Sequence, residues 1–265
     1  MKIVKTLWEE ILDIIEEKIS GFSIDSLESG VRVSRFKEVE NEMNLEIPEE
    51  LKQLYSLNNG TLGLGAILGF ELMTFDDMCL EWKNNKKNDK NEVKDIYVSN
   101  PQGAIRNKLI DSNWIPFAFN NEHTYLAIDL NPDSKGKVGQ IINFGESELD
   151  TEKYVIADSL EDLLRKTIMI YEYNGLYIED GIEVQEGTED ENENLIKFMD
   201  KHLFNIVEYY KSSRALYEED NDLDMSYNLR EYDDYVEEDG YDNYEEDDDY
   251  YGISTYDEED RYDYY

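Results

Sequence analysis

Three short apolar runs dominate the middle of the 265-residue chain, and two polar turns separate them. The runs are Trp114–Phe119, Tyr125–Leu130 and Val138–Ile142. The residues between them are rich in Asn, Asp, Pro and Gly, which favour turns because they tolerate or fix unusual backbone angles. Runs of this length between such turns predict adjacent antiparallel strands. We therefore expect residues 114–143 to form the centre of a β-sheet, with Trp114, Phe117, Phe119, Leu126 and Ile128 in the core.

Apolar residues at helical spacing precede this predicted sheet. Residues 3–19 place apolar side chains three and four positions apart, which indicates an amphipathic helix with a wide apolar face. A second helix is expected after Ser34. A third is expected at Pro48, where proline and the two glutamates that follow it suit the first turn of a helix.

Two local signals predict further helix starts on either side of the central strands. Thr74 and Ser159 each stand three positions before an acidic residue, the spacing of a helix N-cap. The apolar segment 66–75 predicts one or two short strands, and residues 154–157 predict another. Residues 83–95 are rich in Asn and Lys, and we interpret them as an exposed loop.

The chain beyond Gly175 changes in character. Residues 176–185 predict a hairpin, because Asp180-Gly181 is a type I′ turn signal between two apolar runs. Residues 185–194 are an acidic linker, and residues 195–214 have the spacing of one amphipathic helix. The sequence thus predicts helices and short strands over residues 1–184, followed by a C-terminal helix and a tail.

The tail, residues 215–265, carries much of the charge of the protein. The whole chain has 64 acidic and 25 basic residues, a formal net charge of −39. From Tyr217 onwards there are 22 acidic and 2 basic residues, together with 12 of the 21 tyrosines. So few aliphatic side chains cannot offset an ordering cost of roughly 1–2 kcal/mol per residue, and we expect the tail to be disordered.

Such acidity excludes some partners and favours others. Nucleic acids and anionic membranes are bound through Lys and Arg, so this chain is expected to bind neither. A basic protein is the partner that the charge favours. A single cysteine suits a reducing compartment, and no stretch approaches the roughly 18 apolar residues of a membrane span, so a cytoplasmic location is expected.

The candidate chemical sites are weak. Asp129-x-Asn131-x-Asp133 resembles the start of a calcium loop, but the glycine and the bidentate glutamate that such a loop needs are missing. Cys79 and His123 are a conceivable nucleophile and base, yet no local signature surrounds either residue, and Cys79 fits better as a small core side chain. We therefore predict no enzyme activity, no metal and no cofactor.

Three segments resemble the SUKH superfamily over residues 25–175. They are the acidic helix with its Ile-Pro helix start near Pro48, the Trp-x-Pro-Phe-Ala opening at Trp114 with its Gly-Lys-Val-Gly-Gln return, and the closing Asp-Ser-Leu helix start at Asp158. The superfamily includes a yeast regulator of cell-wall synthesis and many bacterial toxin-immunity proteins. The resemblance implies an α+β domain over residues 1–184, in which helices pack against an antiparallel or mixed sheet. It also implies a binding module rather than a catalyst.

Two functional hypotheses follow from the resemblance and the charge. The first is an immunity protein that binds and neutralises a cognate bacterial toxin, a basic nuclease in particular, because a strongly acidic chain would be steered quickly to it. The alternative is a regulatory scaffold that gathers host proteins.

The candidate contact residues for either function lie in two places. One is the turn Asn120, Asn121, Glu122 and His123, where relatives commonly have Asp and Gly. This difference fits a partner-specific contact and variation in an exposed loop equally well. The other is the tail, with Tyr232, Tyr235, Tyr241 and Tyr244 as candidates. The tail is a recognition arm, a nucleic-acid mimic or simply a solubilising segment.

Overall fold

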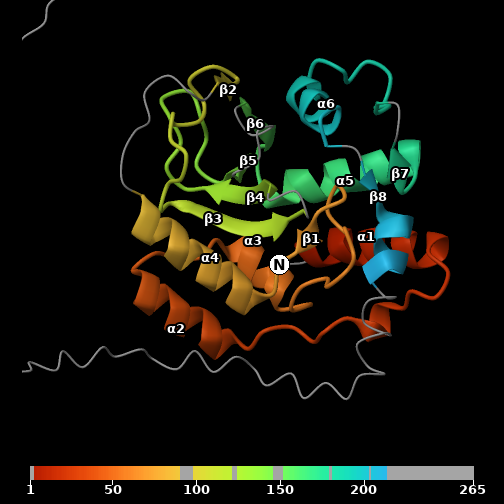
Figure 1. The fold of residues 1–265 in the computed structure, drawn as a ribbon, viewed down its shortest axis with the longest axis horizontal. Coiled ribbons are helices and arrows are strands. Elements are labelled where there is room, and N and C mark those ends of the chain that lie inside the picture. The colour runs from red at the N-terminus through yellow and green to blue at the C-terminus, as the bar shows by residue number, and fades with distance from the viewer. Residues whose placement is uncertain are drawn as a thin grey trace, which may run out of the picture. The chain divides into compact units, whose positions relative to one another are not determined.

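A mixed sheet with the strand order β1-β3-β4-β5-β6-β2 organises the fold (Figure 1). The computed structural model describes residues 3–89, 98–120, 124–145, 152–178, 181–202 and 204–213. These residues all belong to the first of two units, Met1–Asp224 and Met225–Tyr265. The predicted tail, residues 215–265, lies outside the described residues, including the four tyrosines proposed as contacts.

The strands of this sheet have the following bounds: β1 Glu71–Leu72, β2 Val98–Asn100, β3 Trp114–Phe119, β4 Thr124–Asp129, β5 Gln140–Gly145 and β6 Glu152–Ala157. The three central strands are antiparallel, as predicted, with Ile115 opposite Ile128 and Ala127 opposite Ile142. The short edge strand β2 pairs in parallel with β6, which makes the sheet mixed. The α+β prediction is therefore confirmed.

The helices have the following bounds: α1 Ile3–Lys18, α2 Val33–Met43, α3 Glu49–Tyr55, α4 Phe75–Asn88, α5 Leu160–Asn174 and α6 Glu193–Met199, with a 3₁₀ turn at Ile24–Ser26. Both predicted N-caps are confirmed. Thr74 accepts a hydrogen bond from the backbone N–H of Asp77, and Ser159 accepts one from that of Asp162. No helix in the described part of the chain is long and apolar enough to cross a lipid bilayer.

Alternating side chains along the central strands divide the core into two clusters. One face contributes Ile115, Phe117, Leu126 and Ile128 to the large cluster that the helices share. The other face contributes Trp114, Ala127, Ile142 and Phe144 to a smaller cluster, which also contains Ala104 and Ile105 of the segment before β3. Four of the five predicted core residues are fully buried, and Phe119 is half-buried against the large cluster.

Helix α4 is longer than the sequence predicted. The expected loop 83–95 begins only after Asn88, and residues 90–97 lie outside the described part. Lys83 forms an ion pair of 2.7 Å with Glu42, and the Lys86 ammonium donates to the backbone carbonyl of Met43 at 2.9 Å. These two lysines attach the end of α4 to α2, so the helix continues through a segment whose composition suggested a loop.

The predicted hairpin over residues 176–185 is wrong. Strand β7 (Tyr177–Ile178) pairs instead with β8 (Phe204–Asn205), in antiparallel register. The Asn174 side chain accepts from the backbone N–H of Glu183 at 2.6 Å and donates to its carbonyl at 2.8 Å. The backbone groups of Glu183 are thus engaged by a side chain and are not available for a strand partner.

The single helix predicted over residues 195–214 is also wrong. Helix α6 ends at Met199, β8 follows, and residues 206–213 form a second helical segment. The β7–β8 pairing interrupts the helix, because the backbone groups that pair across strands cannot also form helical hydrogen bonds. The aromatic side chain of Phe198 still packs on the sheet through Tyr154 of β6.

Candidate binding site

A pocket of about 300 Å³ lies beside the short edge strand β1. Three separate parts of the chain line it: residues 68–71, the end of β3 at Phe119 and Asn120, and His202 together with residues between Phe204 and Ser212. The labels β1 and β8 locate this region in Figure 1. We call it the β1–β8 pocket.

Aromatic and aliphatic side chains form the walls of the pocket, namely Leu68, Phe70, Phe119, Phe204 and Ile206. Gly69 brings two of the walls together. Its φ is +83°, and a Cβ there would lie 2.6 Å from Cγ of Phe204, so only glycine allows this approach. The Tyr171 hydroxyl fixes the same loop, because it donates to the carbonyl of Gly65 at 2.9 Å and accepts from the N–H of Gly69 at 3.2 Å.

Glu71 is a buried carboxylate in the lining, with 5% of its surface exposed. One oxygen accepts from the backbone N–H of Gly63 at 3.0 Å, and the other accepts from the hydroxyl of Tyr209. Burial raises the pKa of Glu71 above its usual value, although both hydrogen bonds act in the opposite direction. A carboxylate in such a place favours a ligand that brings positive charge or hydrogen-bond donors.

His202 is the second buried polar group, with 4% of its surface exposed. Its ring lies 4.4 Å from that of Phe198 and 6.2 Å from that of Phe70, measured between centroids. Its Nδ1 is buried and has no hydrogen-bond partner within the described residues. Burial, and to a smaller extent the nearby Lys201 ammonium, lowers the pKa of His202 from 6.5 to about 4, so the imidazole is neutral near pH 7.

Replacement of His202 by phenylalanine is expected to make stability less dependent on pH. Between pH 7.5 and 5 the unfolded wild-type chain takes up a proton on His202 that the folded chain does not, because the folded pKa is about 4. The free energy of unfolding of the wild type should therefore fall by about 2 kcal/mol through this residue as the pH falls. The phenylalanine variant lacks this loss, and urea unfolding of both proteins at the two pH values measures the difference.

A buried aspartate changes the free energy of unfolding in the opposite direction as the pH falls. For this reason the experiment compares two proteins. Burial raises the pKa of Asp129 to about 6, so its contribution to stability is lost as the pH rises through that value. It is present in the wild type and in the variant, and it cancels in the difference between them. An equal pH dependence of the two proteins would contradict the low pKa of His202.

One of the residues proposed from the sequence lies at this pocket. Asn120 lines it, accepts from the backbone N–H of Thr124 at 3.0 Å, and donates from its own backbone N–H to the carbonyl of Thr124. Asn121, Glu122 and His123 lie outside the described residues. The sequence interpretation missed Glu71 and His202. The one available signal was a glutamate inside the apolar run 66–75.

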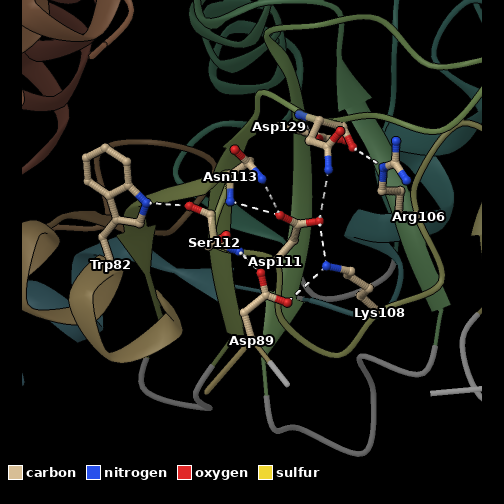
Figure 2. Close-up of polar contacts among 9 residues, drawn as sticks. Trp82, Asp89, Arg106, Lys108, Asp111, Ser112, Asn113 and Asp129 are labelled. Carbon is tan, nitrogen blue, oxygen red and sulfur yellow. Dashed lines mark hydrogen bonds and ion pairs between the residues drawn. The ribbon is translucent and has the colours of Figure 1, made fainter. Parts of the chain in front are cut away.

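The calcium-like motif belongs to a buried polar cluster on the smaller core (Figure 2). Asp111 is fully buried and accepts from the backbone and side chain of Asn113, from the side chain of Asn131 and from the Lys108 ammonium. Asp129 accepts from the N–H of Asn131 and from the amide of Gln140. These carboxylates are thus engaged in hydrogen bonds and an ion pair within the protein. No group of three or more His, Cys, Asp or Glu side chains in the described part could hold a metal.

Cys79 is a core residue, as the sequence suggested, with 2% of its surface exposed. Burial raises the pKa of its thiol to about 12. The thiolate, which is the nucleophilic form, is therefore strongly disfavoured near pH 7. The proposed partner His123 lies outside the described residues.

Comparison with known proteins matches residues 30–166, about half of the chain, to the SMI1/KNR4 family (SUKH-1). The glucan synthesis regulatory protein of Neurospora crassa is 28% identical over 194 residues, which cover 59% of this chain and 36% of that protein. The cell wall assembly regulator SMI1 of Saccharomyces cerevisiae is 26% identical over 163 residues, which cover 47% of this chain and 32% of that protein.

A shorter match is closer in sequence. The KNR4/SMI1 homolog of Kluyveromyces lactis is 44% identical over 64 residues, which cover 24% of this chain and 12% of that protein. The chain spans about a third of the length of the first two curated relatives. The resemblance seen in the sequence is confirmed by the family match over residues 30–166, and this chain belongs to the SMI1/KNR4 family (SUKH-1).

Proposed function

We propose that this chain is a regulatory module that acts by binding other proteins, with the β1–β8 pocket as a contact site. The observation that carries the proposal is a preformed pocket of about 300 Å³ with aromatic walls and two buried polar groups, on a chain of this family. Ligand sites typically combine apolar walls with a few placed polar groups. Two relatives are named as regulators of glucan synthesis and of cell wall assembly, so the regulation that we propose concerns the cell wall.

Toxin neutralisation has less support than regulation. The relatives described above come from fungi, and their names refer to regulation of the cell wall. The family match therefore favours the regulatory alternative over the immunity hypothesis. The predicted basic protein partner is compatible with both functions and remains part of the proposal.

A genetic experiment in the organism that carries the gene separates the two functions. Deletion of the gene is expected to change the sensitivity of the cells to a wall-digesting enzyme, and the wild-type gene is expected to restore it. A Ser212→Trp variant should fail to restore it, because Ser212 is exposed at the pocket and an indole there obstructs the pocket without disturbing the core.

The matched control is Ser134→Trp, since Ser134 is also exposed but lies in the loop between β4 and β5. It should restore wild-type sensitivity. If deletion harms the cells only when a neighbouring toxin gene is intact, toxin neutralisation is the function and the regulatory proposal is wrong.

A further inference from the structure

The carboxylate of Glu71 has unused capacity to accept hydrogen bonds. Its two donors, the backbone N–H of Gly63 and the hydroxyl of Tyr209, are both neutral. No basic side chain among the described residues pairs with it. A carboxylate has about four acceptor sites, so two remain. A buried charge without a cationic partner is unfavourable, and a cation that enters the pocket would relieve this.

His202 supplies an independent indication of a ligand. Its Nδ1 is buried and has no partner within the described part of the chain, and the residue itself lines the same pocket. Buried polar atoms are nearly always hydrogen-bonded, and an exception calls for an explanation. A neutral imidazole offers one donor and one acceptor nitrogen. A ligand rich in N–H groups that reaches both residues would satisfy Nδ1 and the Glu71 carboxylate together.

The walls and rim of the pocket further restrict the chemical class of ligand that fits it. The aromatic rings of Phe70, Phe119 and Phe204 line the pocket, and aromatic faces attract cations. Glu208 adds a second, exposed carboxylate at the rim. A volume of about 300 Å³ is at the lower end for ligand pockets, which fits one side chain of a protein better than a large cofactor.

We propose that the β1–β8 pocket binds an arginine side chain of a partner protein. The planar guanidinium has five N–H donors, which can serve Glu71 and His202 while its faces and aliphatic stem contact the aromatic walls. This inference rests on the proposed function, because it names the chemical group through which the partner is bound.

Other ligands fit the pocket less well. An anion would face two carboxylates. An apolar side chain would cover Glu71 and His202 without replacing their lost contacts with water. Lysine carries its charge at a single point and cannot stack on the rings as a guanidinium does.

In the test, N-acetyl-arginine methylamide is titrated as the probe into the ¹⁵N-labelled full-length chain at 150 mM salt. NMR records the amide signals of the protein at each step. Saturable shifts are expected at the amides of Gly69, Glu71 and Asn205. The citrulline analogue has the same shape without the charge, and it should bind at least about tenfold more weakly. Equal binding of the arginine and citrulline probes, or of the arginine and lysine probes, would overturn the inference.

Variants connect the shifts to the pocket. Glu71→Gln should weaken arginine binding about tenfold, and Glu208→Lys should weaken it severalfold while leaving the fold intact, because Glu208 is exposed. Glu10→Gln and Glu10→Lys make the same charge changes at an exposed site on α1 and should have no effect. Cation binding by the acidic tail would be insensitive to all four changes, and this result would also overturn the inference.

The inference and the proposed function fail separately. If Ser212→Trp abolishes regulation but arginine does not bind, the pocket still has a regulatory role and the ligand class is wrong. If arginine binds with the expected dependence on Glu71 while Ser212→Trp leaves regulation intact, the arginine site stands and its regulatory role is wrong.

Discussion

A chain that begins at residue 30, where the family match starts, is expected not to fold. Helix α1 lies entirely before that residue, yet it supplies six buried side chains to the main core, namely Val4, Leu7, Trp8, Ile11, Leu12 and Ile15. Burial of a large apolar side chain contributes about 1.5–3 kcal/mol. Loss of six such contributions, about 10 kcal/mol or more, matches the whole stability of a typical domain, about 5–15 kcal/mol.

Removal of α1 would also break two hydrogen bonds to other parts of the domain. The Trp8 indole donates to the side chain of Asn58 at 2.9 Å, just after α3. The Lys18 ammonium donates to the carbonyl of Tyr171 at 3.0 Å, near the end of α5. Helix α1 thus contacts both the chain just after α3, inside the matched segment, and the end of helix α5.

Circular dichroism and NMR of residues 30–265 provide the measurement. We expect no cooperative thermal transition and poorly dispersed amide signals. The control is a chain that ends at Ser213, which retains every described residue and should keep the cooperative transition. Cooperative unfolding of residues 30–265 near the wild-type temperature would show that α1 is dispensable.

An Asp111→Ala substitution is expected to lower the free energy of unfolding by about 3–5 kcal/mol. Asp111 is fully buried, and among the described residues its loss leaves the Lys108 ammonium with the Asp89 carboxylate alone, at 2.9 Å. The side chains of Asn113 and Asn131 lose an acceptor at the same time. Figure 2 shows Asn113 and Lys108 converging on the Asp111 carboxylate, so a single truncation leaves several polar groups without this acceptor.

Urea unfolding measures this loss, and an exposed ion pair provides the control. The Asp158 carboxylate lies 3.4 Å from the Lys137 ammonium, and both side chains are largely exposed. An Asp158→Ala change should therefore cost less than about 1 kcal/mol. Similar costs for the two substitutions would mean that burial of Asp111 does not set its importance.

The parts of the fold that were predicted correctly depend on residues close together in the sequence. Thr74 and Ser159 cap their helices through residues three positions away. The strands β3, β4 and β5 are neighbours along the chain and form hairpins. Local patterns are sufficient for such elements, because the same few residues both carry the signal and make the contacts.

The candidate site depends on contacts between distant residues, and the sequence interpretation did not find it. The hydroxyl of Tyr209 reaches Glu71 across 138 positions, and that of Tyr171 reaches Gly69 across 102. The pairing of Tyr177 with Asn205 is also a contact between distant residues, and it places a strand where one continuous helix was expected. His202 had the position of an ordinary member of an amphipathic helix. Only the assembled fold shows that it is buried, with a ring nitrogen that no described residue hydrogen-bonds.

The β1–β8 pocket has two walls that differ in their relation to the family match. Leu68–Glu71, Phe119 and Asn120 lie inside the matched residues 30–166, whereas His202 and the lining residues between Phe204 and Ser212 follow them. The second wall contributes no strand to the six-stranded sheet. If the pocket binds a partner as we propose, substitutions in this second wall are expected to change its selectivity without altering any residue that the family model matches.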